Sequence, residues 1–409
     1  MKSLLIFPIA FGFSAASHAA PATPAATQQM VDRVLKETSA IRGLSIKRPV
    51  VSGVQSIKGV EAMVEGQLKT QTSANELRAT EIFLTQLGLA PAGFGLKKYY
   101  VGMMGEQIAG YYESKTKKFY TSSNVDSGQL EMVMSHELTH ALQDQHFDLS
   151  RLENWPKHDS DARMAMSALV EGDATFTMAR YTTRNPFRAL GVLASALRSP
   201  GDTKALSAGP RILRESLTFP YLQGMQFATK LYQGGGWPSV SRAFSALPQS
   251  TEQVLHFEKY QSREAPVKVE LRDISSTLGA GWKLLDHDVN GEMGLALIVG
   301  EHLQDEPRAT RAAAGWGGDR YSVYGGPKGN LVVQDCRFDT PADAAEWQQA
   351  YAKRTDNRLK KSAQVRGALQ VWNAAPNGVW MEKRGSRVLI LEGTVGVFNP
   401  NAVLNALWR

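Results

Sequence analysis

The residues of this chain whose types and spacing suit shared chemistry lie in one short stretch, SHELTHALQDQH, residues 135 to 146. In a helix, residues four apart lie on one face, so His136 and His140 can direct two imidazoles at a single point. Two imidazoles and a third protein ligand are typical of zinc. Zinc lowers the pKa of water toward ~7, and the neighbouring carboxylate of Glu137 can then act as general base. The spacing therefore predicts a Zn²⁺ centre.

The first candidate for the third ligand is His146, six residues after His140. The pattern H-E-x-x-H-x-x-G-x-x-H has this offset, but its glycine breaks the helix so that the last histidine can return to the metal. Here Gln143 stands in place of the glycine. An unbroken helix would place His146 about 240° around from His140, which disfavours it as a ligand.

The second candidate is Glu171, in the helical stretch MAMSALVEGDATFTMARY. It shares a face with the apolar residues Met164, Ala168, Ala174 and Met178. A buried carboxylate is costly unless it is paired or bound to metal, so an ion pair with Arg163 or Arg180 is the alternative. The two predicted helices are joined by a short connection and can pack antiparallel. We therefore favour Glu171 over His146.

SHELTHALQDQ followed by ALVEGDA resembles the gluzincin zinc peptidases, in which HExxH and a glutamate on the following helix bind zinc. The stretches FPYLQGMQF (219–227), PQSTEQVLHFEKY (248–260) and GWGGDR (315–320) resemble a poorly characterised, exported bacterial branch of these enzymes. The resemblance implies a zincin-like catalytic domain that hydrolyses peptide bonds, with zinc bound by His136, His140 and Glu171.

The same resemblance implies an oxyanion-stabilising tyrosine or histidine beyond Glu171, for which Tyr221 and His256 are the candidates. Thermolysin-like members have an aspartate four residues after the ligand glutamate, where this chain has Thr175. Asp173 is the candidate to accept a hydrogen bond from a ligand histidine instead. Gluzincins also pair substrate backbone with a strand before the HExxH helix, and residues 117–123 are the expected edge strand.

The elements that position these residues indicate an α+β fold. Residues 20–95 are predicted to be a helical region, and residues 96–300 a mostly helical catalytic core. A β-hairpin over 108–123 is expected beside the HExxH helix, and short helices with Pro and Gly breaks, including TFP, over 183–260. Residues 301–409 are predicted to be a small α+β region, where two ββα-like units form one sheet with helices on one face.

The N-terminus, MKSLLIFPIAFGFSAASHAA, is typical of a secretory signal peptide, predicted at 1–19. No later run is long and apolar enough for a transmembrane helix. The single cysteine, Cys336, cannot form an intrachain disulfide and is expected on a strand. The net charge of +7 comes without a Lys/Arg-rich run, which argues against nucleic acid as a partner.

These observations predict an exported zinc metallopeptidase, periplasmic or secreted, that acts on a peptide or protein. Two alternatives remain. One is a cell-envelope binding protein that keeps the fold without the reaction, and the other is a zinc hydrolase of a non-peptide cell-wall amide. The sequence gives no indication of the oligomeric state.

Overall fold

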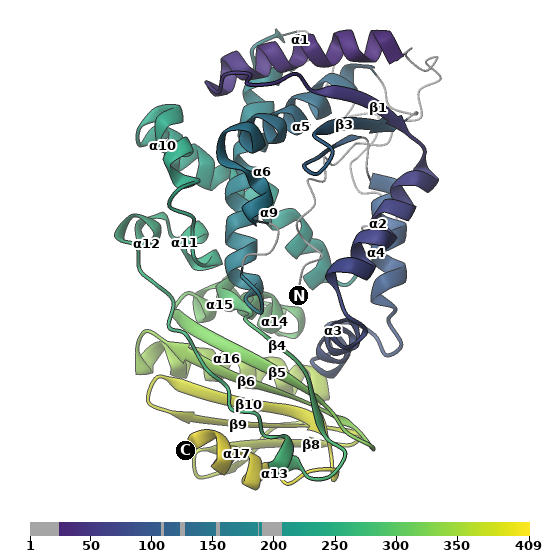
Figure 1. The fold of residues 1–409 in the computed structure, drawn as a ribbon. Coiled ribbons are helices and arrows are strands. Elements are labelled where there is room, and N and C mark those ends of the chain that lie inside the picture. The colour runs from purple at the N-terminus through teal and green to yellow at the C-terminus, as the bar shows by residue number, and fades with distance from the viewer. Residues whose placement is uncertain (1–23, 108–109, 123–126, 153–155, 187, 190–206) are drawn as a thin grey trace.

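The computed structural model describes residues 24–107, 110–122, 127–152, 156–186, 188–189 and 207–409. The predicted signal segment, 1–19, lies outside these ranges. The chain is α+β, with helices over most of its first two thirds and a large sheet in its last third (Figure 1). Within the described ranges, no helix has the length and apolar character needed to cross a membrane.

Three long helices form the centre of the helical part: α5 (Ser127–Phe147), α6 (Ser160–Thr183) and α9 (Arg211–Gln233). A short 3₁₀ turn, η1 (Leu149–Leu152), follows α5. Helices α5 and α6 are antiparallel, since Tyr181 Oη donates to Glu131 at 3.1 Å and Gln143 Nε2 donates to Val170 O at 3.0 Å. This arrangement brings the middle of α5 against the middle of α6.

Helix α9 runs unbroken through Pro220, so the break predicted at TFP is wrong. An interior proline costs about 3 kcal/mol or more, because it removes a backbone donor and crowds the preceding turn. Burial of apolar side chains along α9 offsets this cost, among them Ile212, Leu213, Leu217, Phe219, Phe227 and Leu231.

A three-stranded sheet lies beside α5. Its strands are β1 (Val51–Gln55), β2 (Gly110–Glu113) and β3 (Lys118–Ser122), in the order β1-β3-β2. Strands β2 and β3 form the expected hairpin. However, β3 also pairs in parallel with β1, so the prediction that residues 117–123 form an edge strand is wrong. The edge strand of the hairpin is β2.

The N-terminal region contains α1 (Pro24–Arg42), α2 (Ile57–Gln71), α3 (Ala74–Gln86) and α4 (Leu96–Gln107) in addition to β1. It does not pack as one unit. Helix α1 lies against α5 and α6, whereas Phe83 of α3 contacts Tyr321 of the C-terminal sheet with ring centroids 4.4 Å apart. Short helices complete the middle of the chain: α10 (Gly236–Ala243), α11 (Thr251–Leu255), α12 (Phe257–Ser262) and α13 (Ser275–Leu278).

The C-terminal sheet has seven strands in the order β4-β5-β6-β10-β9-β8-β7. The strands are β4 (Lys283–Asp288), β5 (Trp316–Gly325), β6 (Asn330–Phe338), β7 (Gln364–Arg366), β8 (Leu369–Ala374), β9 (Asn377–Arg384) and β10 (Arg387–Thr394). The helices are α14 (Gly291–Leu303), α15 (Glu306–Ala313), α16 (Pro341–Leu359) and α17 (Pro400–Trp408). The sheet begins before residue 301, where the C-terminal region was predicted to start.

Helices cover both faces of this sheet, so the prediction of helices on one face is wrong. Side chains alternate along β10: Val388 and Ile390 pack in the cluster that contains α16, and Leu389 and Leu391 in the cluster that contains α17. Cys336, on β6, is buried in the first cluster. Because both faces are covered, both alternating sets of side chains in the central part of β10, VLIL, are apolar and buried.

Candidate metal centre

Helix α5 holds His136, Glu137 and His140 in the orientation that their spacing predicts. An apolar stripe on the other side of the helix is buried and anchors it: Leu130, Met134, Leu138, Ala141 and Leu142. The two histidines and Glu137 are themselves at most 1% exposed, and each offers a ligand atom within 4.8 Å of the others. Packing of the apolar stripe thus fixes α5 so that His136 and His140 face α6.

Glu171 of α6 completes a group of three donor atoms. Its Oε2 lies 3.1 Å from His136 Nε2 and 3.3 Å from His140 Nε2, and the two Nε2 atoms are 3.1 Å apart. A tetrahedral zinc with bonds of about 2.0–2.2 Å has ligand atoms about 3.3 Å apart. The three donors thus have the separations that one zinc ion requires.

The ion-pair alternative for Glu171 does not describe its surroundings. Arg180 lies over the ring of Tyr232 at 4.8 Å from its centroid, and also near Phe176 and Trp237. Glu171 is 4% exposed, with the two imidazoles as its partners. A buried carboxylate between two histidines matches the chemistry of a metal ligand.

The electrostatics favour a positive charge among the three donors. Burial opposes ionisation of Glu171, but the two imidazoles outweigh it and lower the pKa of Glu171 to about 2. Burial lowers the pKa of His136. Burial acts in the same direction at His140, but the charge and hydrogen bond of Glu171 raise the pKa of His140 to about 9. The three donors therefore favour a positive charge among them, which a bound metal cation would supply.

His146 lies away from this group. Helix α5 continues to Phe147 without a break at Gln143, and the His146 ring contacts the carbonyl oxygen of Ser45 at 2.8 Å. The structure thus brings Glu171, and not His146, to the two histidines.

Gln143 was not predicted as a functional residue, yet it contacts a candidate ligand. Its Oε1 lies 2.9 Å from His140 Nδ1, and its Nε2 donates to Asp173 Oδ2 at 2.9 Å and to Val170 O at 3.0 Å. Since both of those partners are acceptors, the amide oxygen must face His140. His140 then carries a proton on Nδ1, which leaves Nε2 for a metal. Gln143 lies three residues after His140 on the same helix face, and this spacing is the sequence signal that could have identified Gln143.

The prediction that Asp173 accepts a hydrogen bond from a ligand histidine is wrong. Its carboxylate accepts from Gln143 and from Arg42 Nε at 2.6 Å, and both side chains of the Arg42–Asp173 pair are fully buried. Asp173 is therefore one hydrogen bond further from the centre than expected.

Glu137 lies at the junction of α5 and the small sheet. Its Oε2 accepts from the backbone N–H of Tyr112 at 2.8 Å. Because Tyr112 is on the edge strand β2, this N–H points away from β3 and toward the centre. The candidate base thus lies against the outer edge of β2, the edge strand among the described residues of this sheet.

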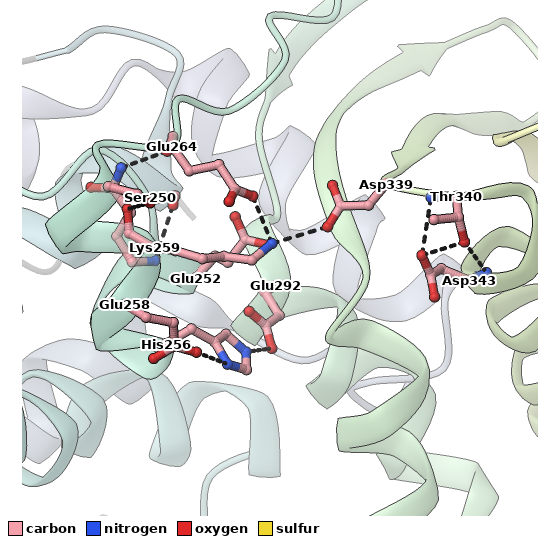
Figure 2. Close-up of polar contacts among 12 residues, drawn as sticks. Ser250, Glu252, His256, Glu258, Lys259, Glu264, Glu292, Asp339, Thr340 and Asp343 are labelled. Carbon is pink, nitrogen blue, oxygen red and sulfur yellow. Dashed lines mark hydrogen bonds and ion pairs between the residues drawn. The ribbon is translucent and has the colours of Figure 1, made fainter.

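The structure separates the two candidates for the oxyanion-stabilising residue. The Tyr221 ring, on α9, stacks on His136 with centroids 5.9 Å apart and planes 26° from parallel. His256 instead contacts Glu292 Oε1 through Nε2 at 2.9 Å, in a cluster of charged residues around Lys259 (Figure 2). Only Tyr221 of the two adjoins the three donors.

Residues 282–403 match the model of a family described as a domain of unknown function (DUF8575). No curated protein and no solved structure matches the chain. Over its C-terminal sheet the chain is therefore similar to this family, whereas the centre on α5 and α6 lies outside the matched residues.

Proposed function

We propose that this protein is a zinc-dependent metallopeptidase with a zincin-like catalytic part of gluzincin type. The observation that carries the proposal is the convergence of His136 Nε2, His140 Nε2 and Glu171 Oε2 within 3.1–3.3 Å of one another. Zinc would supply Lewis acidity at this point, polarising a carbonyl and lowering the pKa of water.

The residues of the chain divide the remaining tasks. Glu137, buried beside the histidines, is the base that takes the proton from the attacking water and passes it to the leaving amine. Tyr221, whose ring stacks on that of His136, is the candidate to donate a hydrogen bond to the developing oxyanion. The outer edge of β2 would bind the extended main chain of the substrate, which favours peptides without demanding particular side chains.

The signal-like N-terminus supports an exported protein, so we place this activity in the periplasm or outside the cell. Peptide bonds of a protein substrate fit the strand edge better than a cell-wall amide does, because glycan-linked amides offer little main chain to pair with β2.

The test compares the purified mature chain with its Glu137→Gln variant. We expect about one zinc per chain in both by mass spectrometry, and hydrolysis of an unstructured protein by the wild type alone. Hydrolysis that survives the substitution unchanged would contradict the mechanism. Cleavage of peptidoglycan fragments in place of protein would indicate a cell-wall amidase. Zinc binding by a wild type that cleaves neither substrate would indicate a binding protein.

A further inference from the structure

We propose that Gln143, held in place by the buried Asp173–Arg42 pair, is a positioning residue that fixes His140 as a metal ligand. The inference rests on the function proposed above. Through Arg42, the N-terminal helix α1 is thereby linked to the candidate metal centre.

A continuous line of hydrogen bonds joins α1 to His140. Arg42, the last residue of α1, donates to Asp173 at 2.6 Å, Gln143 donates to Asp173 at 2.9 Å, and Gln143 Oε1 lies 2.9 Å from His140 Nδ1. Each of these four side chains is at most 1% exposed. Water therefore cannot replace any of them without the structure opening.

The line of hydrogen bonds decides which nitrogen of His140 can bind a metal. A neutral imidazole carries its proton on either nitrogen, and a proton on Nε2 would block coordination there. An acceptor at Nδ1 selects the productive form and fixes the ring plane. Gln143 can be that acceptor only while its amide nitrogen is occupied elsewhere, and Asp173 and Val170 occupy it.

Arg42 keeps Asp173 in its role. The guanidinium also donates to Ser241 Oγ at 3.2 Å and lies 4.7 Å from the centroid of the Trp237 ring. Without Arg42, a fully buried Asp173 carboxylate would be left unbalanced two residues from Glu171. Through Arg42, helix α1 therefore stabilises the side chains that orient His140.

The experiment measures zinc affinity of the full mature chain by competition with a chromophoric chelator. Gln143→Leu keeps the side-chain volume and removes the hydrogen bonds, and we expect its zinc Kd to rise about 10–100-fold. The matched control is Gln145→Leu, because Gln145 lies on the same helix and its amide contacts the backbone of Lys47 and Arg48. We expect the control to bind zinc as the wild type does.

A second readout does not depend on activity. In zinc-loaded protein with ¹⁵N-labelled histidine, the wild type should show a slowly exchanging Nδ1 proton on His140, and Gln143→Leu should lose it. Arg42→Met should weaken zinc binding in the same direction, whereas Arg33→Met should not, since Arg33 joins α1 to Glu131 of α5 away from the histidines.

The outcomes separate this inference from the proposed function. Wild type and Gln143→Leu binding zinc equally tightly, with the Nδ1 proton kept in both, would overturn the positioning role and leave the zinc site standing. A wild type that binds no zinc would overturn the proposed function, and the inference with it.

Discussion

Gly172 and Gly224 are in backbone contact where α6 crosses α9: a Cβ on Gly172 would lie 2.1 Å from the Gly224 carbonyl oxygen. The contact stands next to Glu171 and one turn after Tyr221, so it sets how closely the two candidate site residues approach. We expect Gly172→Ala to force the helices apart, lowering the free energy of unfolding by about 1–3 kcal/mol and weakening zinc binding. Denaturant titration and chelator competition measure the two effects.

The matched control is Gly66→Ala in α2, where a Cβ would meet nothing within 4 Å. Alanine is the better helix former, so this variant should be more stable by about 0.5–1 kcal/mol and bind zinc normally. Gly172→Ala with unchanged stability and affinity would mean that the crossing tolerates a wider separation.

The identity of the third ligand gives a second prediction. Glu171→Gln removes the charge but keeps the shape, and the purified variant should retain far less than the one zinc expected for the wild type. His146→Ala should retain full zinc, because His146 contacts Ser45 and not the donors. Mass spectrometry after dialysis measures both. Loss of zinc in His146→Ala together with full zinc in Glu171→Gln would contradict the centre described here.

Tyr221 gives a third prediction. Tyr221→Phe keeps the ring that stacks on His136 and removes the hydroxyl, so zinc content should not change. If the hydroxyl stabilises the oxyanion, kcat should fall about 10²–10³-fold with little change in KM. Tyr232→Phe, on the far part of α9, is the control and should be fully active. A Tyr221→Phe variant with wild-type kcat would leave the ring a packing role only.

Prediction from the sequence succeeds where the geometry depends on one helix. His136 and His140 are brought together by the helical period alone, and the apolar stripe of α5 follows the same period. Glu171 is accessible to this reasoning because a carboxylate in an apolar stripe needs a partner. The apolar run RVLILEG likewise predicts the strand β10, although not which helix covers each face.

The remaining features depend on contacts between distant parts of the chain. Arg42 and Asp173 are 131 residues apart, and nothing local to either marks the pair. The parallel pairing of β1 with β3, which moves the sheet edge to β2, is equally non-local. Helix α9 continues through Pro220 because tertiary burial outweighs the local preference for a break.

Lys259 gives a fourth prediction. Its Nζ lies 2.7 Å from Glu252, 2.7 Å from Glu264 and 3.0 Å from Asp339, joining α11 and α12 to the end of β6 (Figure 2). The three carboxylates offer oxygens within 4.8 Å of one another. Lys259→Met should therefore destabilise the protein by about 1–2 kcal/mol, less than for a fully buried pair, because water screens Glu264 and Asp339, which are 45% and 40% exposed.

Millimolar Ca²⁺, which prefers clustered carboxylate oxygens, should restore part of the stability lost in Lys259→Met. Thermal unfolding with and without Ca²⁺ measures this, with the wild type as control, since the ammonium already fills its cluster. An equal response of the two proteins to Ca²⁺ would contradict the cluster as the cause.

The pH dependence of stability tests the same cluster from the side of Glu252. Burial, reinforced by the charges of Glu292 and Asp339, outweighs Lys259 and raises the pKa of Glu252 to about 7. In the unfolded chain a glutamate titrates near pH 4.3, so between about pH 4.3 and 7 the folded state holds a proton that the unfolded state has lost. The stability contributed by this group is therefore fully present below about pH 4.3, and it is lost as the pH rises from there through the folded-state pKa of about 7. Glu252→Gln removes this titration. The free energy of unfolding of the variant should therefore increase relative to that of the wild type between about pH 4.3 and 7, and the difference should stay constant above pH 7. Denaturant titrations of both proteins from pH 4.5 to 8.5 measure the difference in their free energies of unfolding. A difference that stays constant across this range would mean that Lys259 keeps Glu252 ionised throughout.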